Sequence, residues 1–487
     1  MSKTQLQDTQ LFREQCYLAG AWASADSGET LEVTNPANGD VLGHVPVMGK
    51  AETTRAIESA HEAFQLWRQT TASERSDILR RWYELMMAHQ DDLGRLMTLE
   101  QGKPLPEAKG EIAYAASFLK WFAEEAPRAY GDTIPGSKAD QHILVIKQPV
   151  GVSAAITPWN FPAAMITRKA GAALAAGCPM VVKPASETPF SALALAELAE
   201  RAGVPQGVLS VLTGKSSEIG EAMTHHPKVR KISFTGSTEV GRILMRQSAE
   251  NIQKISLELG GNAPFIVFDD ADLDKAVEGA IAAKFRNTGQ TCVCVNRFIV
   301  QEGVYETFMT KLKHAMEAQL VTGDGFESGV NQAALINTAA VDKVREHLED
   351  ALSKGAKLLT GGEPHPLGGH YVTPTLLAEI TSDMRIAKEE TFGPLTGAIR
   401  FRTEEEAIEI ANDTPFGLAA YFYSQNIHRV WRVAEGLESG MIGINEGLIS
   451  NVAAPFGGVK ASGLGREGSK YGMDEYMETK YLCMGGA

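Results

Sequence analysis

A cysteine among small and polar residues is the first candidate for chemistry. Cys292 lies in the run GQTCVC, residues 289–294, just after a predicted helix. A thiolate is a strong nucleophile, and a position at a loop-to-helix junction would lower the pKa of the thiol. A single cysteine is more often a small buried side chain. The run therefore leaves two interpretations, a nucleophile with a lowered pKa or a packing residue.

A carboxylate in an apolar setting is the second candidate. Glu258 stands between two leucines in LELGG, residues 257–261, and precedes a Gly-Gly turn. A carboxyl group that is buried there without a partner would have a perturbed pKa, which is typical of a general base. The alternative is a buried carboxylate with a purely structural role.

Two further segments could hold an anionic ligand. In FTGSTEVG, residues 234–241, Ser237 follows Gly236 and can cap a helix whose N-terminus favours a phosphate group. The segment lacks the three glycines of the usual dinucleotide fingerprint, so an ordinary capped helix is an equal interpretation. In VVKPAS, Lys183 and Ser186 follow a buried strand, where open parallel sheets bind ligands.

The elements around these residues follow two patterns. Residues 50–130 show apolar positions at helical spacing, and residues 141–150 form a β-branched run that predicts a strand. From residue 151, short apolar runs alternate with helical segments, which predicts a doubly wound parallel sheet. A second series of the same kind begins near residue 259, where we place a domain boundary.

The composition excludes several classes of protein. The 487 residues include 46 Lys and Arg against 60 Asp and Glu, and the net charge of −14 argues against nucleic-acid or membrane partners. The five cysteines do not form a secreted disulfide framework, and the N-terminal residues lack a signal-peptide pattern. We expect a cytoplasmic protein with no membrane span and no metal site.

Seven motifs, taken together, resemble the aldehyde dehydrogenase superfamily over nearly the whole chain. They are TPWNFP (157–162), KPAS (183–186), FTGST (234–238), LELGG (257–261), FRNTGQTCVC (285–294), EETFGP (389–394) and PFGGVKASGLGREG (455–468). The segments ITRKAGAALAAGC, NEGLIS and GREGSKYG further resemble the succinate semialdehyde dehydrogenases and their relatives that act on glutarate semialdehyde.

The resemblance implies an α/β fold in three parts. A Rossmann-like cofactor-binding domain would comprise residues 1–127 and 150–258, and an α/β catalytic domain residues 259–460. Residues 128–149 and 461–487 would form a small β extension for oligomerisation. Its strand would pair with the sheet of another subunit, in a homodimer or a homotetramer.

The resemblance also implies the catalytic roles. Cys292 would attack the aldehyde, Asn160 would stabilise the oxyanion with the Cys292 N–H group, and Glu258 would activate the water that hydrolyses the thioester. Glu467 would belong to a proton relay, or else be an exposed charge. Cys294 would be either a small buried residue or the partner of Cys292 in a reversible disulfide that blocks catalysis.

For the cofactor, the resemblance implies contacts with a nicotinamide dinucleotide. The residues are Trp159, Lys183, Ser186, Gly236, Ser237, Leu259, Glu390 and Phe392. Relatives that prefer NAD often carry Glu at the position of Ser186, where it would repel a 2′-phosphate. Ser186 therefore predicts NADP as the preferred cofactor, with NAD as the alternative.

For the substrate, Arg168, Arg286 and Ser450 match the carboxylate-binding residues of the semialdehyde dehydrogenases. Arginines suit a distal carboxylate because they form bidentate, charge-assisted hydrogen bonds. We expect the irreversible oxidation of succinate semialdehyde to succinate, with glutarate semialdehyde as the alternative substrate. A CoA-acylating enzyme and an inactive structural relative are rivals, and the presence of Cys292, Asn160 and Glu258 argues against them.

Overall fold

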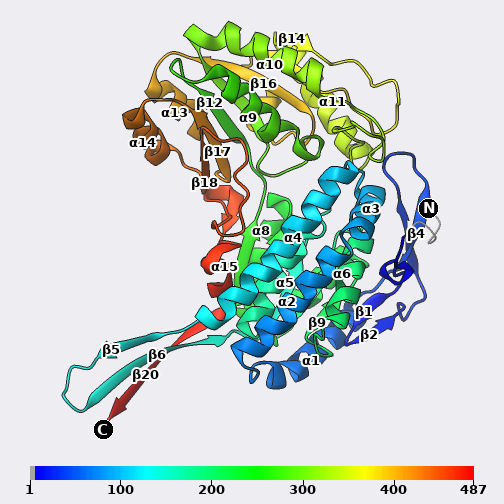
Figure 1. Ribbon diagram of the computed structural model, residues 1–487, viewed down its shortest axis with the longest axis vertical. Helices are drawn as coiled ribbons and strands as arrows, with labels where there is room; N and C mark the ends of the chain where they lie inside the picture. The colour runs from blue at the N-terminus through cyan, green and yellow to red at the C-terminus, as the bar shows by residue number, and fades with distance from the viewer. Residues whose placement is uncertain (1–5, 487) are drawn as a thin grey trace.

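Two large sheets organise the chain in the computed structural model, which describes residues 6–486 (Figure 1). Within those residues the first sheet has eight strands, in the spatial order β19 (Gly463–Leu464), β11 (Lys254–Glu258), β10 (Val229–Thr235), β7 (Val152–Ile156), β8 (Met180–Lys183), β9 (Leu209–Val211), β1 (Cys16–Leu18) and β2 (Ala21–Ala23). The five strands from β7 to β11 run parallel, which confirms the predicted parallel sheet.

Helices cover both faces of this sheet, and its central strands are accordingly buried on both sides. One face packs against α2 (Ala72–Ala88), α4 (Leu105–Glu125), α5 (Ala164–Ala176) and α6 (Pro189–Arg201). The other face packs against α1 (Lys50–Trp67) and α7 (Ser216–His225), with α8 (Thr238–Ser248) beside α7. Helix α3 (Gln90–Gln101) joins α2 to α4. The helices predicted between residues 50 and 130 are therefore confirmed.

The second sheet is also a parallel sheet apart from one edge strand. Its order within the described residues is β14 (Lys357–Thr360), β15 (Thr375–Ala378), β16 (Leu395–Phe401), β13 (Val295–Gln301), β12 (Ala263–Val267), β17 (Ala419–Tyr423) and β18 (Met441–Ile444). Its helices are α9 (Leu273–Phe285), α10 (Tyr305–Gln319), α11 (Thr338–Ser353), α12 (Arg385–Lys388), α13 (Glu404–Asn412) and α14 (Ile427–Gly436). The chain passes from the first sheet to the second between Glu258 and Ala263.

A long β arm extends from the body of the molecule (Figure 1). It consists of β5 (Asp132–Pro135), β6 (Gln141–Pro149) and the C-terminal strand β20 (Met477–Gly485), with β6 in the middle. Part of the predicted extension lies elsewhere, because β19 pairs with β11 and α15 (Ser469–Asp474) packs on α5. A separate hairpin joins β3 (Thr30–Thr34) to β4 (Val41–Pro46). No helix within residues 6–486 has the length and apolar character needed to cross a membrane.

The strand order places the candidate residues at one locus. In the first sheet the order reverses between β7 and β10, and open α/β sheets bind ligands at such a switch point. The segments that follow these two strands carry Asn160 and Gly236. In the second sheet, Cys292 and Phe392 precede the parallel neighbours β13 and β16. The carboxyl edge of one sheet thus meets the amino edge of the other.

Candidate active site

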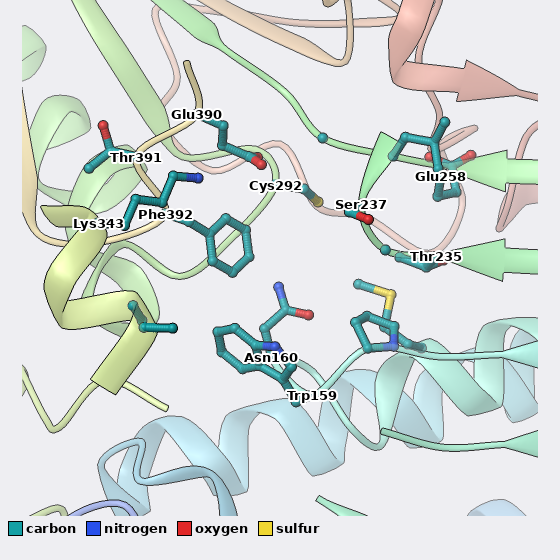
Figure 2. A pocket seen from close by; sticks show the side chains of 17 residues that line it. Trp159, Asn160, Thr235, Ser237, Glu258, Cys292, Lys343, Glu390, Thr391 and Phe392 are labelled. Carbon is teal, nitrogen blue, oxygen red and sulfur yellow. The ribbon is translucent and has the colours of Figure 1, made fainter. Parts of the chain in front are cut away.

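A cavity of about 340 Å³ brings together most of the predicted site residues (Figure 2). Its lining includes all three predicted catalytic residues and six of the predicted cofactor residues: Cys292, Glu258, Asn160, Trp159, Gly236, Ser237, Leu259, Glu390 and Phe392. Asn160 and Trp159 reach into it from one side and Cys292 from the other, with Glu258 on the side of the first sheet.

Cys292 differs from the prediction in its ionisation. Burial raises the pKa of its thiol to about 12, and the carboxylates of Glu390 and Glu258 act in the same direction. Arg168 and Arg286 oppose them. The expectation of a lowered pKa is wrong because Cys292 lies in a turn before a strand, not at a helix N-terminus, and because burial disfavours the thiolate.

The side chain of Asn160 is oriented by residues 286–294, the loop that carries Cys292 and is called the catalytic loop below. Its Nδ2 donates a hydrogen bond of 3.0 Å to the carbonyl oxygen of Gln290, two residues before Cys292. An amide nitrogen carries two hydrogens, so this bond leaves one of them for another acceptor. The Oδ1 atom is buried and has no hydrogen-bond partner among the described residues. Asn160 can therefore donate to an oxygen that forms beside the thiol.

Glu258 is the last residue of β11 and lies buried without a hydrogen bond to either carboxylate oxygen among the described residues. Burial raises its pKa well above the ordinary value, and the negative charge of Glu467 raises it further. The cations Lys169 and Arg168 lower it, to a smaller extent. A buried carboxyl group of this kind matches the general-base interpretation and excludes a satisfied structural carboxylate.

Glu467 is buried, so its interpretation as an exposed charge is wrong. Its carboxylate forms a buried ion pair with Lys169 and lies 3.5 Å from Nη1 of Arg168. Lys169 also donates a 2.6 Å hydrogen bond to Oγ1 of Thr235, whose residue lines the cavity. These polar groups connect the Glu258 side of the cavity to the C-terminal segment.

The cofactor side of the cavity has the form of an anion cradle. Ser237 caps α8, because its hydroxyl accepts a 3.3 Å hydrogen bond from the N–H group of Val240. This confirms the predicted capped helix. A Cβ atom on Gly236 would lie 2.5 Å from the ring of Phe234, so the backbone there approaches more closely than a larger residue permits.

One carboxylate and two aromatic rings complete this side. Oε1 of Glu390 accepts a 3.0 Å hydrogen bond from the N–H group of Gly261, and burial raises the pKa of Glu390 to about 7. The rings of Trp159 and Phe392 meet edge to face, with centroids 5.5 Å apart. Phe392 has a φ of 58°, a conformation that non-glycine residues seldom adopt and that is frequent at functional sites.

Lys183 and Ser186 are not among the residues that line this cavity. They lie at and beyond the carboxyl end of β8, next to β7 in the first sheet. Burial lowers the pKa of the Lys183 ammonium to about 8, while Glu187 raises it. Ser186 is half-buried, and Glu187 is exposed.

The two predicted substrate arginines both act on the thiol of Cys292, as its pKa shows. The guanidinium group of Arg168 is buried and lies over the ring of Phe456, 4.6 Å from the centroid. Arg286 lies 5.0 Å from the ring centroid of Phe161 and forms no ion pair within 4.0 Å among residues 6–486. Arg286 shares a second, small cavity with Ser450.

Cys294 is buried and both cysteines are free thiols. The sulfur of Cys294 lies 2.6 Å from Oγ1 of Thr291 and donates a 3.2 Å hydrogen bond to the carbonyl oxygen of Lys284. The thiol of Cys294 is therefore held by the polypeptide, and it must leave these partners before it can bond to Cys292.

Several lining residues were absent from the prediction. The most polar is Lys343 on α11, beside Ala339 and Ala340, and it lowers the pKa of Glu390. In the sequence, Lys343 is one of many charges on an amphipathic helix, a pattern that indicates a solvated face. Nothing in that pattern separates it from its neighbours.

The comparisons with known proteins agree with this arrangement. The model of the aldehyde dehydrogenase family matches residues 22–482. The chain belongs to this family. It is therefore an aldehyde oxidoreductase, and its α/β architecture is the aldehyde dehydrogenase fold.

Three relatives show how close the similarity is. The enzyme is 64% identical over 482 residues to a glutarate-semialdehyde dehydrogenase of Pseudomonas aeruginosa PAO1, covering 99% of this chain and 100% of that one. It is 63% identical over 480 residues to the succinate-semialdehyde dehydrogenase [NADP(+)] GabD of Escherichia coli K12, covering 99% of each. A crystal structure of succinate-semialdehyde dehydrogenase from Burkholderia pseudomallei superposes with a TM-score of 0.98 at 63% identity, over 99% of this chain and 100% of that one.

Proposed function

We propose that this aldehyde dehydrogenase oxidises a short aldehyde with a distal carboxylate, succinate semialdehyde to succinate, with glutarate semialdehyde as the alternative. The observation that carries the proposal is a pair of guanidinium groups, Arg168 and Arg286, which lie over aromatic rings and whose charges both lower the pKa of the Cys292 thiol. Neither arginine lines the large cavity, and Arg286 lines the small cavity with Ser450. Arginine binds carboxylates through paired, charge-assisted hydrogen bonds. The names of the bacterial relatives support the same substrate class.

The charge balance favours an anionic substrate. Two cations, Arg168 and Lys169, face the single carboxylate of Glu467. Glu258 does not compensate the remaining positive charge while it is protonated, and burial favours its protonated form. Arg286 forms no ion pair within 4.0 Å among the described residues, and the pKa of Glu107, which Arg286 lowers, is raised overall by burial. A bound carboxylate would therefore compensate charge that the polypeptide leaves uncompensated.

The first half of the reaction uses Cys292 and Asn160. The Cys292 sulfur attacks the aldehyde carbon, and the thiol proton leaves to a base, for which the raised pKa of Glu258 is suited. The free hydrogen of Asn160 Nδ2 and the backbone N–H group of Cys292 hold the oxygen that becomes negatively charged. A bound nicotinamide dinucleotide would supply the two-electron oxidant as a hydride acceptor, and the product left on Cys292 would be a thioester.

The second half uses Glu258 as a base for water. After it has passed on the thiol proton, Glu258 takes a proton from a water molecule, and the water oxygen attacks the thioester carbonyl carbon. The carbon–sulfur bond then breaks to give the carboxylic acid and the Cys292 thiolate. Glu467 and Lys169 then carry the proton away as a relay. Hydrolysis makes the oxidation irreversible, and a buried base at this position argues against transfer of the acyl group to CoA.

The chain's own residues fit a dinucleotide and favour NADP over NAD. The capped N-terminus of α8 suits a pyrophosphate, and Glu390 suits the hydroxyl groups of the nicotinamide ribose. The Lys183 ammonium and the Ser186 hydroxyl suit the adenosine ribose with its 2′-phosphate. A Glu in place of Ser186 would repel that phosphate.

The β arm is suited to assembly with further copies of the chain. β20 forms its outer edge, and no strand within the described residues pairs with that edge. An exposed strand edge is a template for pairing with another chain. We therefore propose a homodimer or a homotetramer. Light scattering, which measures the mass in solution, tests this proposal.

The substrate proposal is tested with arginine variants and two aldehydes of the same chain length. In R286A, we expect KM for succinate semialdehyde to rise by about tenfold or more, because a charge-assisted contact is lost. KM for butanal, which has no carboxylate, should change less than about twofold. Equal effects on the two aldehydes would contradict the proposed role of Arg286. K388A, on α12, is the matched control for removing a surface cation.

A further inference from the structure

Lys103 does not line the cavity, but it is hydrogen-bonded to the backbone of Asn160, which does. Lys103 follows α3, which ends at Gly102 with a φ of 93°, and precedes α4. Only 1% of Lys103 is exposed, although lysine is seldom fully buried without a partner. Its position therefore calls for partners that compensate the charge.

The ammonium group of Lys103 has two such partners and a ring beneath it. Nζ donates to Oε2 of Glu111 at 2.5 Å and to the carbonyl oxygen of Asn160 at 2.8 Å. It also lies 4.1 Å from the ring centroid of Phe161. Lys103 thus bonds directly to the peptide of the residue proposed to stabilise the oxyanion.

Glu111 binds the C-terminal end of the segment 160–164, whose N-terminal residue is bonded to Lys103. Its other oxygen, Oε1, accepts hydrogen bonds from the N–H groups of Ala163 at 3.0 Å and Ala164 at 3.3 Å. Ala164 is the first residue of α5. The buried pair of Lys103 and Glu111 therefore fixes the segment 160–164 at both ends.

The catalytic loop holds Asn160 from the opposite side. Nδ2 of Asn287 donates to the same Asn160 carbonyl oxygen at 3.0 Å, and the Asn160 amide donates to the carbonyl oxygen of Gln290. Both acceptor positions of the Asn160 carbonyl are then in use. Its peptide is fixed between α4 and the loop that carries Cys292.

We propose that Lys103, together with Glu111, is a positioning residue for catalysis, which fixes the peptide of Asn160 so that its amide faces the oxygen that forms at Cys292. The proposal rests on the oxyanion role given to Asn160 above. An oxyanion donor is effective because its direction is set before the reaction, and small displacements of a donor cost large factors in rate.

A role in stability alone does not account for this arrangement. Buried ion pairs are weak evidence for stability, because apolar residues of similar volume often replace them without loss. Here Lys103 donates one of its hydrogen bonds to the carbonyl oxygen of Asn160, a residue of the site. Removal of the pair should accordingly change the chemistry more than the binding.

The test is a double-mutant cycle between the Lys103–Glu111 pair and Asn160. The measured quantity is the rate constant of the NADPH burst in the first turnover. The substrate is butanal, because it has no carboxylate and does not depend on the proposed arginine contacts. The pair variant K103M/E111Q removes both charges together, so no lone buried charge remains. We expect its burst rate constant to fall by about 10- to 100-fold. KM for butanal and the rate of Cys292 alkylation by iodoacetamide should each change less than about threefold.

The decisive comparison is the same pair of changes in N160A. If Lys103 acts through Asn160, K103M/E111Q should lower the burst rate of N160A by less than about threefold. Equal factors in both backgrounds would overturn the proposal. A burst rate of N160A equal to the wild type would instead show that the oxyanion role of Asn160 is wrong.

Two further variants keep the test decisive. K103Q/E111Q also leaves no lone buried charge and keeps an acceptor oxygen for the hydrogen bonds to α5, so it gives the same comparison if K103M/E111Q does not fold. K109M removes an exposed lysine of α4 that pairs with Asp91, and it should leave the burst rate unchanged.

Discussion

The negative charge of Glu467 raises the pKa of Glu258 within one buried cluster, although the two residues lie far apart in the sequence. Glu467 is bonded to Lys169 and lies near Arg168, and its charge raises the pKa of Glu258. The proton affinity of the proposed base therefore depends on a residue from the C-terminal segment.

The first prediction concerns the pH dependence of thioester hydrolysis. Glu258 acts as a base only when ionised, so the hydrolysis rate should rise with pH through the pKa of Glu258. In E467Q, a negative charge is lost while Lys169 and Arg168 remain, so the pKa falls and the rising limb should move to lower pH by about one unit. The steady-state rate after the burst, measured from pH 5 to 9, gives this limb.

The charge of Lys169 provides the opposite control. K169M removes a cation that lowers the pKa of Glu258, so its limb should move to higher pH. Limbs that move in the same direction in E467Q and K169M, or not at all, would show that the cluster does not set the proton affinity of Glu258.

The second prediction concerns the reactivity of Cys292. The charge of Glu390 raises the pKa of the Cys292 thiol, so E390Q should lower that pKa and increase the thiolate fraction. We expect alkylation by iodoacetamide at pH 8.5 to be about three- to tenfold faster. E389Q is the matched control, because Glu389 pairs with Arg385 and does not line the cavity. An equal increase in E389Q would contradict the electrostatic explanation.

The third prediction concerns the backbone beside the nucleophile. A Cβ atom on Gly261 would lie 2.5 Å from the carbonyl oxygen of Cys292, so G261A must displace the catalytic loop. We expect kcat to fall by about tenfold or more. G303A is the control, since its Cβ would meet no atom within 4 Å. A G261A enzyme with wild-type kcat would show that the position of this loop is not critical.

The fourth prediction concerns the pair of thiols. Peroxide oxidises the Cys292 thiolate to a sulfenic acid with release of water, and the Cys294 thiol then displaces a second water to form a disulfide. We expect the inactive wild type to have lost two hydrogens in its intact mass and to recover with dithiothreitol. C294A should gain oxygen and recover less. Inactivation of C294A that persists and is fully reversed by thiol would exclude the disulfide switch.

The sequence was sufficient to predict the sheets and the chemical groups at their edges. The alternation from residue 151 predicted the parallel strands. LELGG and GQTCVC made Glu258 and Cys292 candidates, and only the resemblance to the family favoured their catalytic interpretations. These features are local, because strand periodicity and turn glycines depend on neighbouring residues. Their meeting in one cavity then follows from the strand order.

Other features could not be predicted because distant elements determine them. The pKa of Cys292 depends on Glu390 and on burial, and no pattern around residue 292 contains either. Lys103 occurs in a Gly-Lys-Pro turn between two helices and Lys343 among ordinary helix charges, and only tertiary packing buries the one and brings the other to the cavity. Side chains of this kind are found from contacts, not from spacing.

The most direct test of the account is kcat/KM of the wild-type enzyme for succinate semialdehyde, glutarate semialdehyde and butanal, each with NADP and with NAD, followed by absorbance of the reduced cofactor. We expect kcat/KM for one carboxylated aldehyde with NADP to exceed kcat/KM for butanal, and also to exceed kcat/KM for the same aldehyde with NAD. One methylene distinguishes the two semialdehydes by about 10- to 200-fold at most. Equal kcat/KM for butanal and both semialdehydes would contradict the arginine pocket, and equal kcat/KM for both cofactors would contradict the role of Ser186.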